Sequence, residues 1–127
     1  MFENSDAFGS MSTNDLVATR AFYEDTLGLT VTDAEMPGLF LVQLPLGGAV
    51  LVYPKGDHVP ASFTVLNFPV DDIDAAVDAL EAKGVSLQRY PGMHQDDRGI
   101  MRGRAGGNGP DQAWFTDPAG NILSVLH

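Results

Sequence analysis

The chain has 127 residues, of which 44% are apolar and none is cysteine. This length suits one compact domain, and the lack of thiols excludes disulfides, thiolate metal sites and a cysteine nucleophile. A formal charge of −10 argues against nucleic acid and anionic membrane surfaces as partners, because both are bound through lysine and arginine. No apolar run reaches the roughly 20 residues of a membrane span, and the N-terminus lacks the basic region of a secretory signal. A cytoplasmic protein is therefore expected.

Two segments of similar pattern, residues 12–31 and 68–87, predict two helices. An aspartate precedes each helix, where its carboxylate can accept hydrogen bonds from the N–H groups of the first turn. A glycine follows each helix, because glycine adopts the left-handed conformation that ends helices. The predicted caps and terminal glycines are Asp15 with Gly28 and Asp72 with Gly84.

Short apolar runs bounded by glycine and proline predict strands around each helix. In the first half they lie near residues 7–11, 30–33, 39–44 and 49–53. In the second half they lie near residues 62–68, 86–90, 113–116 and 122–126. Each half is thus predicted to follow the order βαβββ. One domain, 1–127, would hold a first module at about 6–54 and a second at about 61–127, joined by a linker at 55–60.

Residues 91–112 form a predicted long connection with six of the 14 glycines. A connection of this length without regular structure is commonly a lid or a mobile loop, and we expect a lid. Three arginines gather in it, Arg98, Arg102 and Arg104. They either meet an anionic ligand or solvate the loop of an acidic protein, and the second interpretation is preferred.

The segments NDLVATRAFYEDTLGLTV (14–31) and AWFTDPAGNILSVL (113–126) closely resemble the two signature segments of the vicinal oxygen chelate (VOC) superfamily. That group includes glyoxalase I, extradiol dioxygenases, fosfomycin-inactivating enzymes and bleomycin-resistance binding proteins. The resemblance runs from about Ala7 to the C-terminus. It implies an α+β fold in which two βαβββ modules form a curved mixed sheet around a concave cavity. It also implies a homodimer.

Many VOC enzymes hold a divalent metal through histidine, glutamate or glutamine side chains that project inward from the strands. The positions that match those ligands here are Phe8, Val50, Val65 and Ser124. A phenyl ring and aliphatic chains cannot coordinate a metal, and a hydroxyl is a poor ligand. The resemblance therefore implies an apolar cavity with no metal and no cofactor. Strand alternation adds further residues to the cavity side, namely Asp6, Ser10, Val52, Phe63, Asn67, Ile122 and Leu126.

The expected function is binding or sequestration of a small organic molecule. The predicted ligand-binding residues are Ser10, Tyr53, Phe63, Asn67, Trp114 and Ser124. Asn67 either hydrogen-bonds a ligand carbonyl or amide, or ties a strand to a loop. Trp114 either joins Tyr53, Tyr90 and Phe63 in an aromatic wall for a planar ligand, or packs in the core or at a dimer interface.

Two alternatives remain open from the sequence. The first is a VOC-type lyase, isomerase or dioxygenase that uses a loop histidine, His94 or His58, or a metal at unforeseen positions. His94 could be oriented by a neighbouring aspartate at 96 or 97 if the loop folds over the cavity, although loop histidines are more often solvated. The second is a scaffold whose cavity is filled by its own side chains, Phe8 and Phe63.

Overall fold

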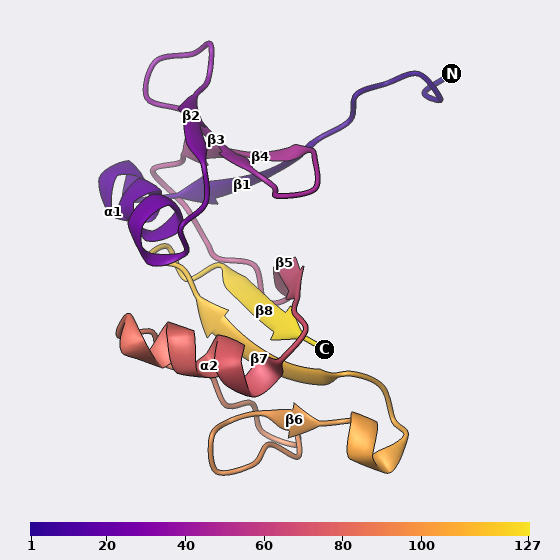
Figure 1. The fold of residues 1–127 in the computed structure, drawn as a ribbon. Coiled ribbons are helices and arrows are strands. Elements are labelled where there is room, and N and C mark those ends of the chain that lie inside the picture. Colours follow the sequence, from indigo (N-terminus) through magenta and orange to yellow (C-terminus); the bar gives the residue numbers. More distant parts are fainter. The chain divides into compact units, whose positions relative to one another are not determined.

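The computed structural model describes residues 1–127, which divide into two compact units, Met1–Pro60 and Ala61–His127 (Figure 1). The boundary follows the linker expected from the sequence. None of the helices has the length and apolarity needed to cross a bilayer. Each unit is described by itself below.

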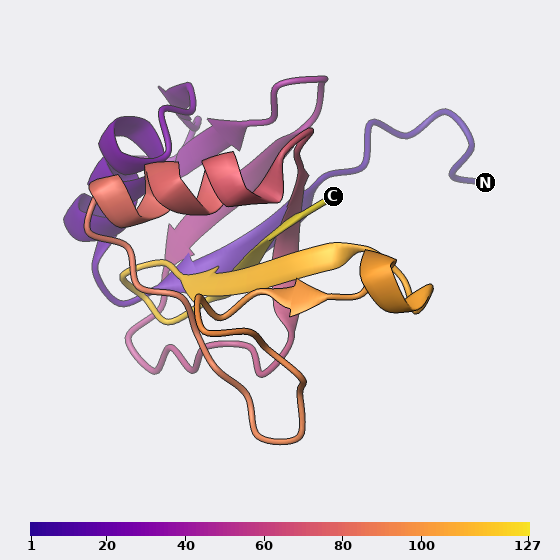
Figure 2. The same ribbon diagram turned by 60° about the horizontal axis from the view of Figure 1, so that its bottom comes forward.

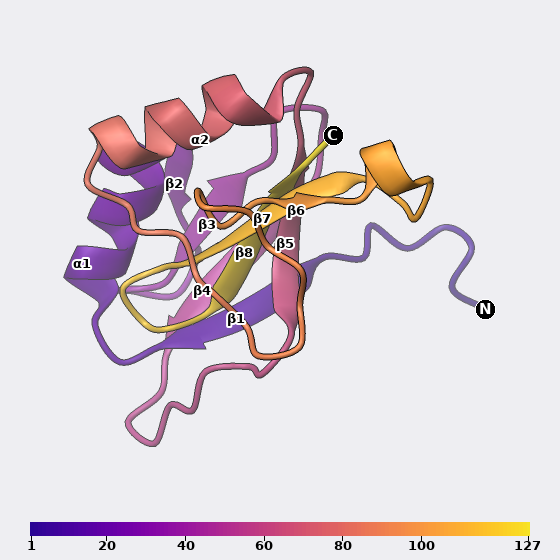
Figure 3. The ribbon, with the colours of Figure 1, turned by 90° about the horizontal axis from the view of Figure 1, so that it is seen from below.

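The first unit is one βαβββ module with a four-stranded sheet. Its elements are β1 (Gly9–Thr13), α1 (Leu16–Ala21), β2 (Val31–Asp33), β3 (Phe40–Gln43) and β4 (Ala49–Pro54). The strand order is β1-β4-β3-β2, which Figure 3 shows from one edge of the sheet to the other. β1 runs parallel to β4, and the remaining pairs are antiparallel.

The predicted cap of the first helix is confirmed. The Asp15 carboxylate accepts a hydrogen bond from the N–H of Ala18 at 3.0 Å, which satisfies a donor that the first turn leaves without an intrahelical partner. Beyond α1 the chain widens into a π-helical turn at Phe22–Thr26. Gly28 follows with φ of 69°, a left-handed conformation that glycine adopts without a steric penalty.

The two faces of the first sheet differ in what covers them. Met11 faces the helical segment, since the Tyr23 hydroxyl lies 3.6 Å from its sulfur. Thr13 faces it too, because its hydroxyl lies 2.8 Å from that of Thr19. Side chains alternate along a strand, so Ser10 and Ser12 lie on the opposite side. We call the side away from the helix the open face of each sheet.

This alternation corrects the expected placement of Val50 and Val52. Val52 pairs in register with Met11, so it lies on the helix side, where it is fully buried. Val50, two residues away, shares that side. The β4 residue in register with Ser10 is Leu51, so Leu51 and Tyr53 belong to the open face.

The second unit repeats the first. Its elements are β5 (Thr64–Pro69), α2 (Ile73–Ala82), β6 (Met101–Arg102), β7 (Asp111–Thr116) and β8 (Ile122–Leu126). The strand order β5-β8-β7-β6 is the order of the first unit, again with a parallel first pair. The α+β class and the two βαβββ modules are therefore confirmed, and each module builds its own mixed sheet.

The second helix also follows the sequence prediction. Asp72 accepts a hydrogen bond from the N–H of Ala75 at 3.0 Å, and Gly84 has φ of 80°. Ile73, Val77 and Leu80 are buried, which places the apolar stripe of the helix on its packed side.

The prediction of a strand at residues 86–90 is wrong, because the structure has no strand there. That segment makes one backbone hydrogen bond to β7, from Gln88 N–H to the Trp114 carbonyl at 2.7 Å. Further hydrogen bonds of its backbone go to the Gln95 side chain. The Gln95 amide accepts from Tyr90 N–H at 2.9 Å and donates to the Gln88 and Gly99 carbonyls at 2.9 and 2.7 Å. The second strand of the module is instead β6, inside the connection expected to be a loop, beside β7 (Figure 2).

The alternation expected along β5 also breaks. A register shift lies between Thr64 and Leu66, so that Thr64 pairs with Ile122 and Asn67 with Ser124. Ile122 and Ser124 are two residues apart and share a face. Thr64, rather than Val65, therefore lies on the same side as Asn67, as expected when a β-bulge inserts one residue.

Candidate functional site

A groove of about 970 Å³ opens on the first unit. Its floor is the open face of β3 and β4, at Leu41, Gln43, Ala49 and Leu51. One wall is the N-terminal arm, residues 6–8, and the other is the end of β2 with the turn that follows it, residues 33–36. Ligand pockets commonly measure about 300–1,000 Å³ and are lined mainly by apolar groups. The groove therefore has the size and the lining of a small-molecule site.

The open face of the second sheet carries a chain of polar side chains. The Gln112 amide nitrogen donates to the Ser124 hydroxyl at 3.1 Å, and that hydroxyl donates to the Asn67 carbonyl oxygen at 2.6 Å. Ser124 is 0% exposed and Asn67 is exposed. Because the bond to Ser124 engages the oxygen of Asn67, its NH₂ group is left to donate outward. One buried hydroxyl, that of Ser124, thus orients the two amide side chains of this chain.

Two aromatic residues stand beside this chain. Trp114 pairs in register with Ser124, and its indole N–H donates to the Thr64 hydroxyl at 3.1 Å. The Tyr90 ring meets the Trp114 ring edge to face, with centroids 5.9 Å apart. Burial raises the pKa of the Tyr90 hydroxyl, which therefore stays neutral near pH 7.

The predicted ligand-binding residues fall into two groups. Ser10 and Tyr53 lie on the open face of the first sheet. Asn67, Ser124 and Trp114 lie together on the second. Phe63 precedes β5 and is largely exposed. The groove floor residues Leu41, Gln43, Ala49 and Leu51 were missed by sequence reasoning, since nothing in the run 49–53 shows which of its residues face the helix.

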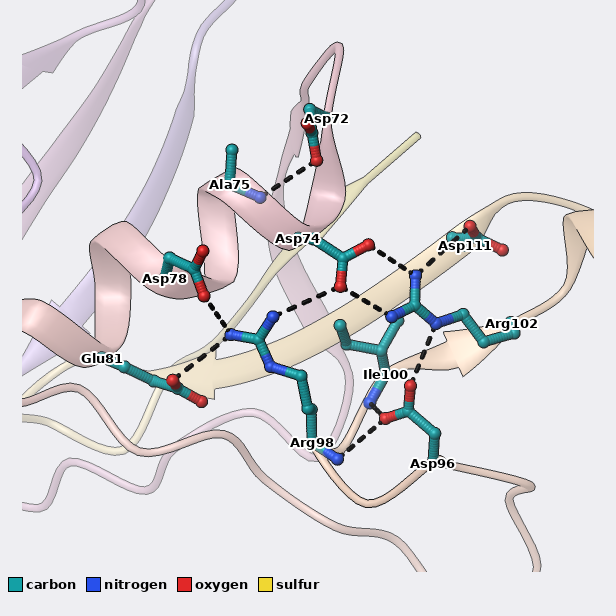
Figure 4. A network of polar contacts seen from close by, with 10 residues as sticks. All are labelled: Asp72, Asp74, Ala75, Asp78, Glu81, Asp96, Arg98, Ile100, Arg102 and Asp111. Carbon is teal, nitrogen blue, oxygen red and sulfur yellow. Dashed lines mark hydrogen bonds and ion pairs between the residues drawn. The ribbon is translucent and has the colours of Figure 1, made fainter.

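Arg98 and Arg102 lie against helix α2 (Figure 4). The Arg102 guanidinium binds both oxygens of Asp74, at 2.7 and 2.9 Å, and its Nε lies 3.0 Å from the Asp96 carboxylate. Arg98 reaches Asp78 at 2.5 Å. The preferred interpretation, that these arginines only solvate a loop, is therefore wrong for Arg98 and Arg102. They join the connection to the helix.

These ion pairs also place the connection relative to the open face. Arg102 pairs in register with Asp111, which lies 3.9 Å from it and alternates with Gln112 along β7. Since Arg102 also binds α2, the network lies on the helix side of the sheet, away from Asn67 and Ser124. This part of the predicted lid does not cover the polar chain.

The ion pairs between the connection and helix α2 are sensitive to acid. Hydrogen bonds from Arg102, outweighing burial, lower the pKa of Asp74. Burial by itself raises the pKa of Asp96, but hydrogen bonds from Ile100 N–H and Arg102 outweigh it, and the net pKa is lowered. A carboxyl with a lowered folded-state pKa stabilises the fold above its unfolded-state pKa, about 3.9 for aspartate. That stabilisation is lost as the pH falls through the folded-state pKa.

We expect the midpoint of thermal unfolding to fall as the pH drops below about 4, and part of this fall should come from Asp74 and Asp96. In Arg102→Met the fall should be shallower, because the main cation holding both carboxylates is gone. Added salt should lower the wild-type midpoint at pH 7 more than that of the variant. Thermal melts from pH 2 to 7 measure this. If the melting temperature fell equally with pH in both proteins, the role given to Arg102 would be contradicted.

The family model of the Glyoxalase/Bleomycin resistance protein/Dioxygenase superfamily matches residues 10–125. The chain belongs to this superfamily. No curated protein matches the chain. The resemblance of residues 14–31 and 113–126 to VOC signatures is thereby confirmed.

Solved structures with this fold cover nearly the whole chain. The antibiotic-binding protein TnmS3 from Streptomyces sp. CB03234 is 22% identical, with a TM-score of 0.65, over 94% of this chain and 91% of that one. Lactoylglutathione lyase from Agrobacterium tumefaciens is 23% identical, with a TM-score of 0.61, over 96% and 92%. A glyoxalase family protein from Enterococcus faecalis is 20% identical, with a TM-score of 0.66, over all of both chains. At such identities the likeness concerns the fold.

The superfamily resemblance implies a metal, and the residues at the matching positions do not fit one. Phe8 offers a phenyl ring, and the β4 position offers an aliphatic chain whether it is Val50 or Leu51. The Ser124 hydroxyl is already engaged by Asn67 and Gln112. Among residues 1–127, no three or more histidine, aspartate or glutamate side chains stand together where they could hold a metal ion. We derive no chemical step through a metal.

The two loop histidines differ in how they are held. His58 Nδ1 lies 2.6 Å from the Ser12 hydroxyl, and Ser12 is on the open face of β1. His94 is exposed. The Asp96 carboxylate accepts from the backbone N–H groups of Arg98 and Ile100 and from Arg102, so it is oriented toward these groups rather than toward His94.

Proposed function

We propose that the protein binds a small organic molecule in the groove of its first unit, without a metal ion. The observation that carries the proposal is the groove itself, about 970 Å³ over the apolar floor of Leu41 and Leu51. Burial of apolar ligand surface supplies about 25 cal/mol per Å², so a floor of this kind supports binding with no bond made or broken.

Two further observations support binding rather than metal-assisted chemistry. The positions at which superfamily enzymes carry ligands hold Phe8 and Ser124, whose side chains suit packing and hydrogen bonding. The groove floor itself carries one amide side chain, that of Gln43, for a directional contact. A homodimer in the cytoplasm that sequesters a toxic metabolite is one form that this function would take.

The neutral dye Nile red tests the groove. We expect wild-type protein to raise its fluorescence and the variant Ala49→Trp to bind it at least about tenfold more weakly, since an indole on the floor occupies the space of the dye. Ala49 lies on the open face of β4, so the larger side chain should leave the fold intact. Fluorescence titration gives both affinities, and EDTA should change neither.

Ala82→Trp is the matched control, because Ala82 is an exposed residue at the end of α2 in the other unit. It should bind the dye as wild type does. Equal affinities in Ala49→Trp and wild type would rule out the groove as the site, and sensitivity of the wild-type affinity to EDTA would rule out metal independence.

The alternative is a lyase, isomerase or dioxygenase of the same superfamily, and the contact between Ser12 and His58 favours it. A hydrogen bond that fixes an imidazole ring prepares it to act as a general base. Turnover of a glutathione hemithioacetal or a catechol would favour this alternative. Loss of that turnover in His58→Asn, with the melting temperature kept, would assign the reaction to His58.

A further inference from the structure

The polar part of the groove lining is acidic. The titratable residues that line it are Asp6, Asp33 and Glu35, and the remaining polar side chain is that of Gln43. No lysine, arginine or histidine lines the groove. A ligand in it therefore meets negative charge above an apolar floor.

Asp33 turns its carboxylate toward the helix side of the sheet, since it pairs in register with Phe40, and there it is neutralised by an arginine of α1. Arg20 Nη1 lies 2.6 Å from the Asp33 carboxylate. Asp6 and Glu35 have no ion-pair partner in the structure. They also come from opposite walls, Asp6 from the N-terminal arm and Glu35 from the turn after β2. Two uncompensated charges thus flank the groove.

We propose that the groove selects small organic cations, with the apolar body of the ligand on Leu41 and Leu51 and its ammonium group toward Asp6 and Glu35. This inference rests on the proposed function and adds the chemical class of its ligand. A cation gains Coulomb attraction from both walls, whereas an anion is repelled by both. Because the carboxylates are solvent-exposed, two such contacts together favour the cation over a neutral analogue by about tenfold.

Three probes with one ring system separate charge from burial, namely 2-naphthylmethylamine, 2-naphthylmethanol and 2-naphthoate. Titrations at pH 7 followed by methyl NMR of Leu41 and Leu51 give the three affinities and locate the probe. We expect the protonated amine to bind about tenfold more tightly than the alcohol, and the carboxylate most weakly. In 1 M salt, where the screening length falls to about 3 Å, the preference should shrink toward unity.

The double variant Asp6→Asn, Glu35→Gln keeps the shapes of both side chains and removes both charges. It should bind the amine and the alcohol equally, with the affinity for the alcohol unchanged. Asp25→Asn is the matched control, because Asp25 is an exposed carboxylate of the π-helical turn outside the groove. It should keep the full preference.

The outcomes distinguish this inference from the proposed function. If the alcohol binds in the groove as tightly as the amine, or if the double variant keeps the preference, cation selection is overturned and small-molecule binding stands. If none of the three probes perturbs Leu41 or Leu51, the cation site is overturned, and the Nile red titration decides whether the groove binds neutral molecules.

Discussion

Replacing Asp117 with alanine is expected to lower the free energy of unfolding by about 3 kcal/mol. The Asp117 side chain accepts from the N–H groups of Ala119 and Asn121 at 2.9 and 3.0 Å, and from the Asn121 side-chain amide at 3.0 Å. Asp117 is only 4% exposed, so alanine would leave these buried donors without that acceptor. A fall of about 10 °C in melting temperature should accompany the change.

The turn that contains Asp117 also fixes how two strands of the second sheet pair. It joins β7 to β8, with Gly120 at φ of 82°, and so sets the register in which Trp114 faces Ser124. Asp117→Asn keeps one acceptor oxygen, so it should lower the free energy of unfolding by about half as much as Asp117→Ala does. Asp25→Ala, at an exposed position, should be nearly neutral. Urea unfolding of the three variants gives the comparison, and a loss below about 1 kcal/mol in Asp117→Ala would contradict the buried-acceptor role.

Replacing Tyr23 with alanine is expected to lower the free energy of unfolding by about 4 kcal/mol, a typical loss when a buried aromatic residue is cut to alanine. Tyr23 is 0% exposed and packs edge to face on Phe22, with ring centroids 5.4 Å apart. Its removal opens a cavity between the helical segment and β1 that the surrounding side chains can fill only in part. Urea unfolding monitored by circular dichroism measures the loss.

Tyr23→Phe separates packing from hydrogen bonding. It keeps the ring and removes the hydroxyl that lies 3.6 Å from the Met11 sulfur, a weak acceptor. It should therefore cost less than about 1 kcal/mol. A loss in Tyr23→Phe as large as that in Tyr23→Ala would show that the hydroxyl, rather than the ring, holds the helical segment to the sheet.

The sequence predicted those parts of the fold that short-range chemistry decides. Asp15 and Asp72 act as caps because an aspartate side chain reaches the N–H three residues ahead whatever surrounds it. Gly28 and Gly84 end their helices for an equally local reason. The duplicated βαβββ order followed from these signals, and the family resemblance rested on the same residues.

The parts that the sequence did not predict depend on longer-range partners. Every residue from Ala49 to Tyr53 is apolar, so the face of Leu51 was set by pairing with β1 rather than by a visible alternation. The bulge between Thr64 and Leu66 leaves no mark in composition. Arg102 is 28 residues from Asp74, and a charge pattern read along the chain does not reveal such a pair.

The strand expected at residues 86–90 shows a different limit. Residues 86–90 contain only two apolar residues, Leu87 and Tyr90, and some of their backbone partners are supplied by the side chain of Gln95. Propensity describes whether a segment suits a sheet, while the presence of a backbone partner is a property of the whole fold. The same holds for Asn67, whose contact with Ser124 spans 57 residues.

The alternation of faces makes this domain a suitable scaffold for laboratory evolution. Leu41, Gln43, Ala49 and Leu51 line the groove from positions that alternate with Val42, Val50 and Val52, which are buried on the helix side. A combinatorial library at the four groove positions would therefore vary the recognition surface while leaving the packed core unchanged. New ligand preferences could then be selected with little loss of folded protein, because open-face side chains contribute little to the packing that keeps the first unit folded.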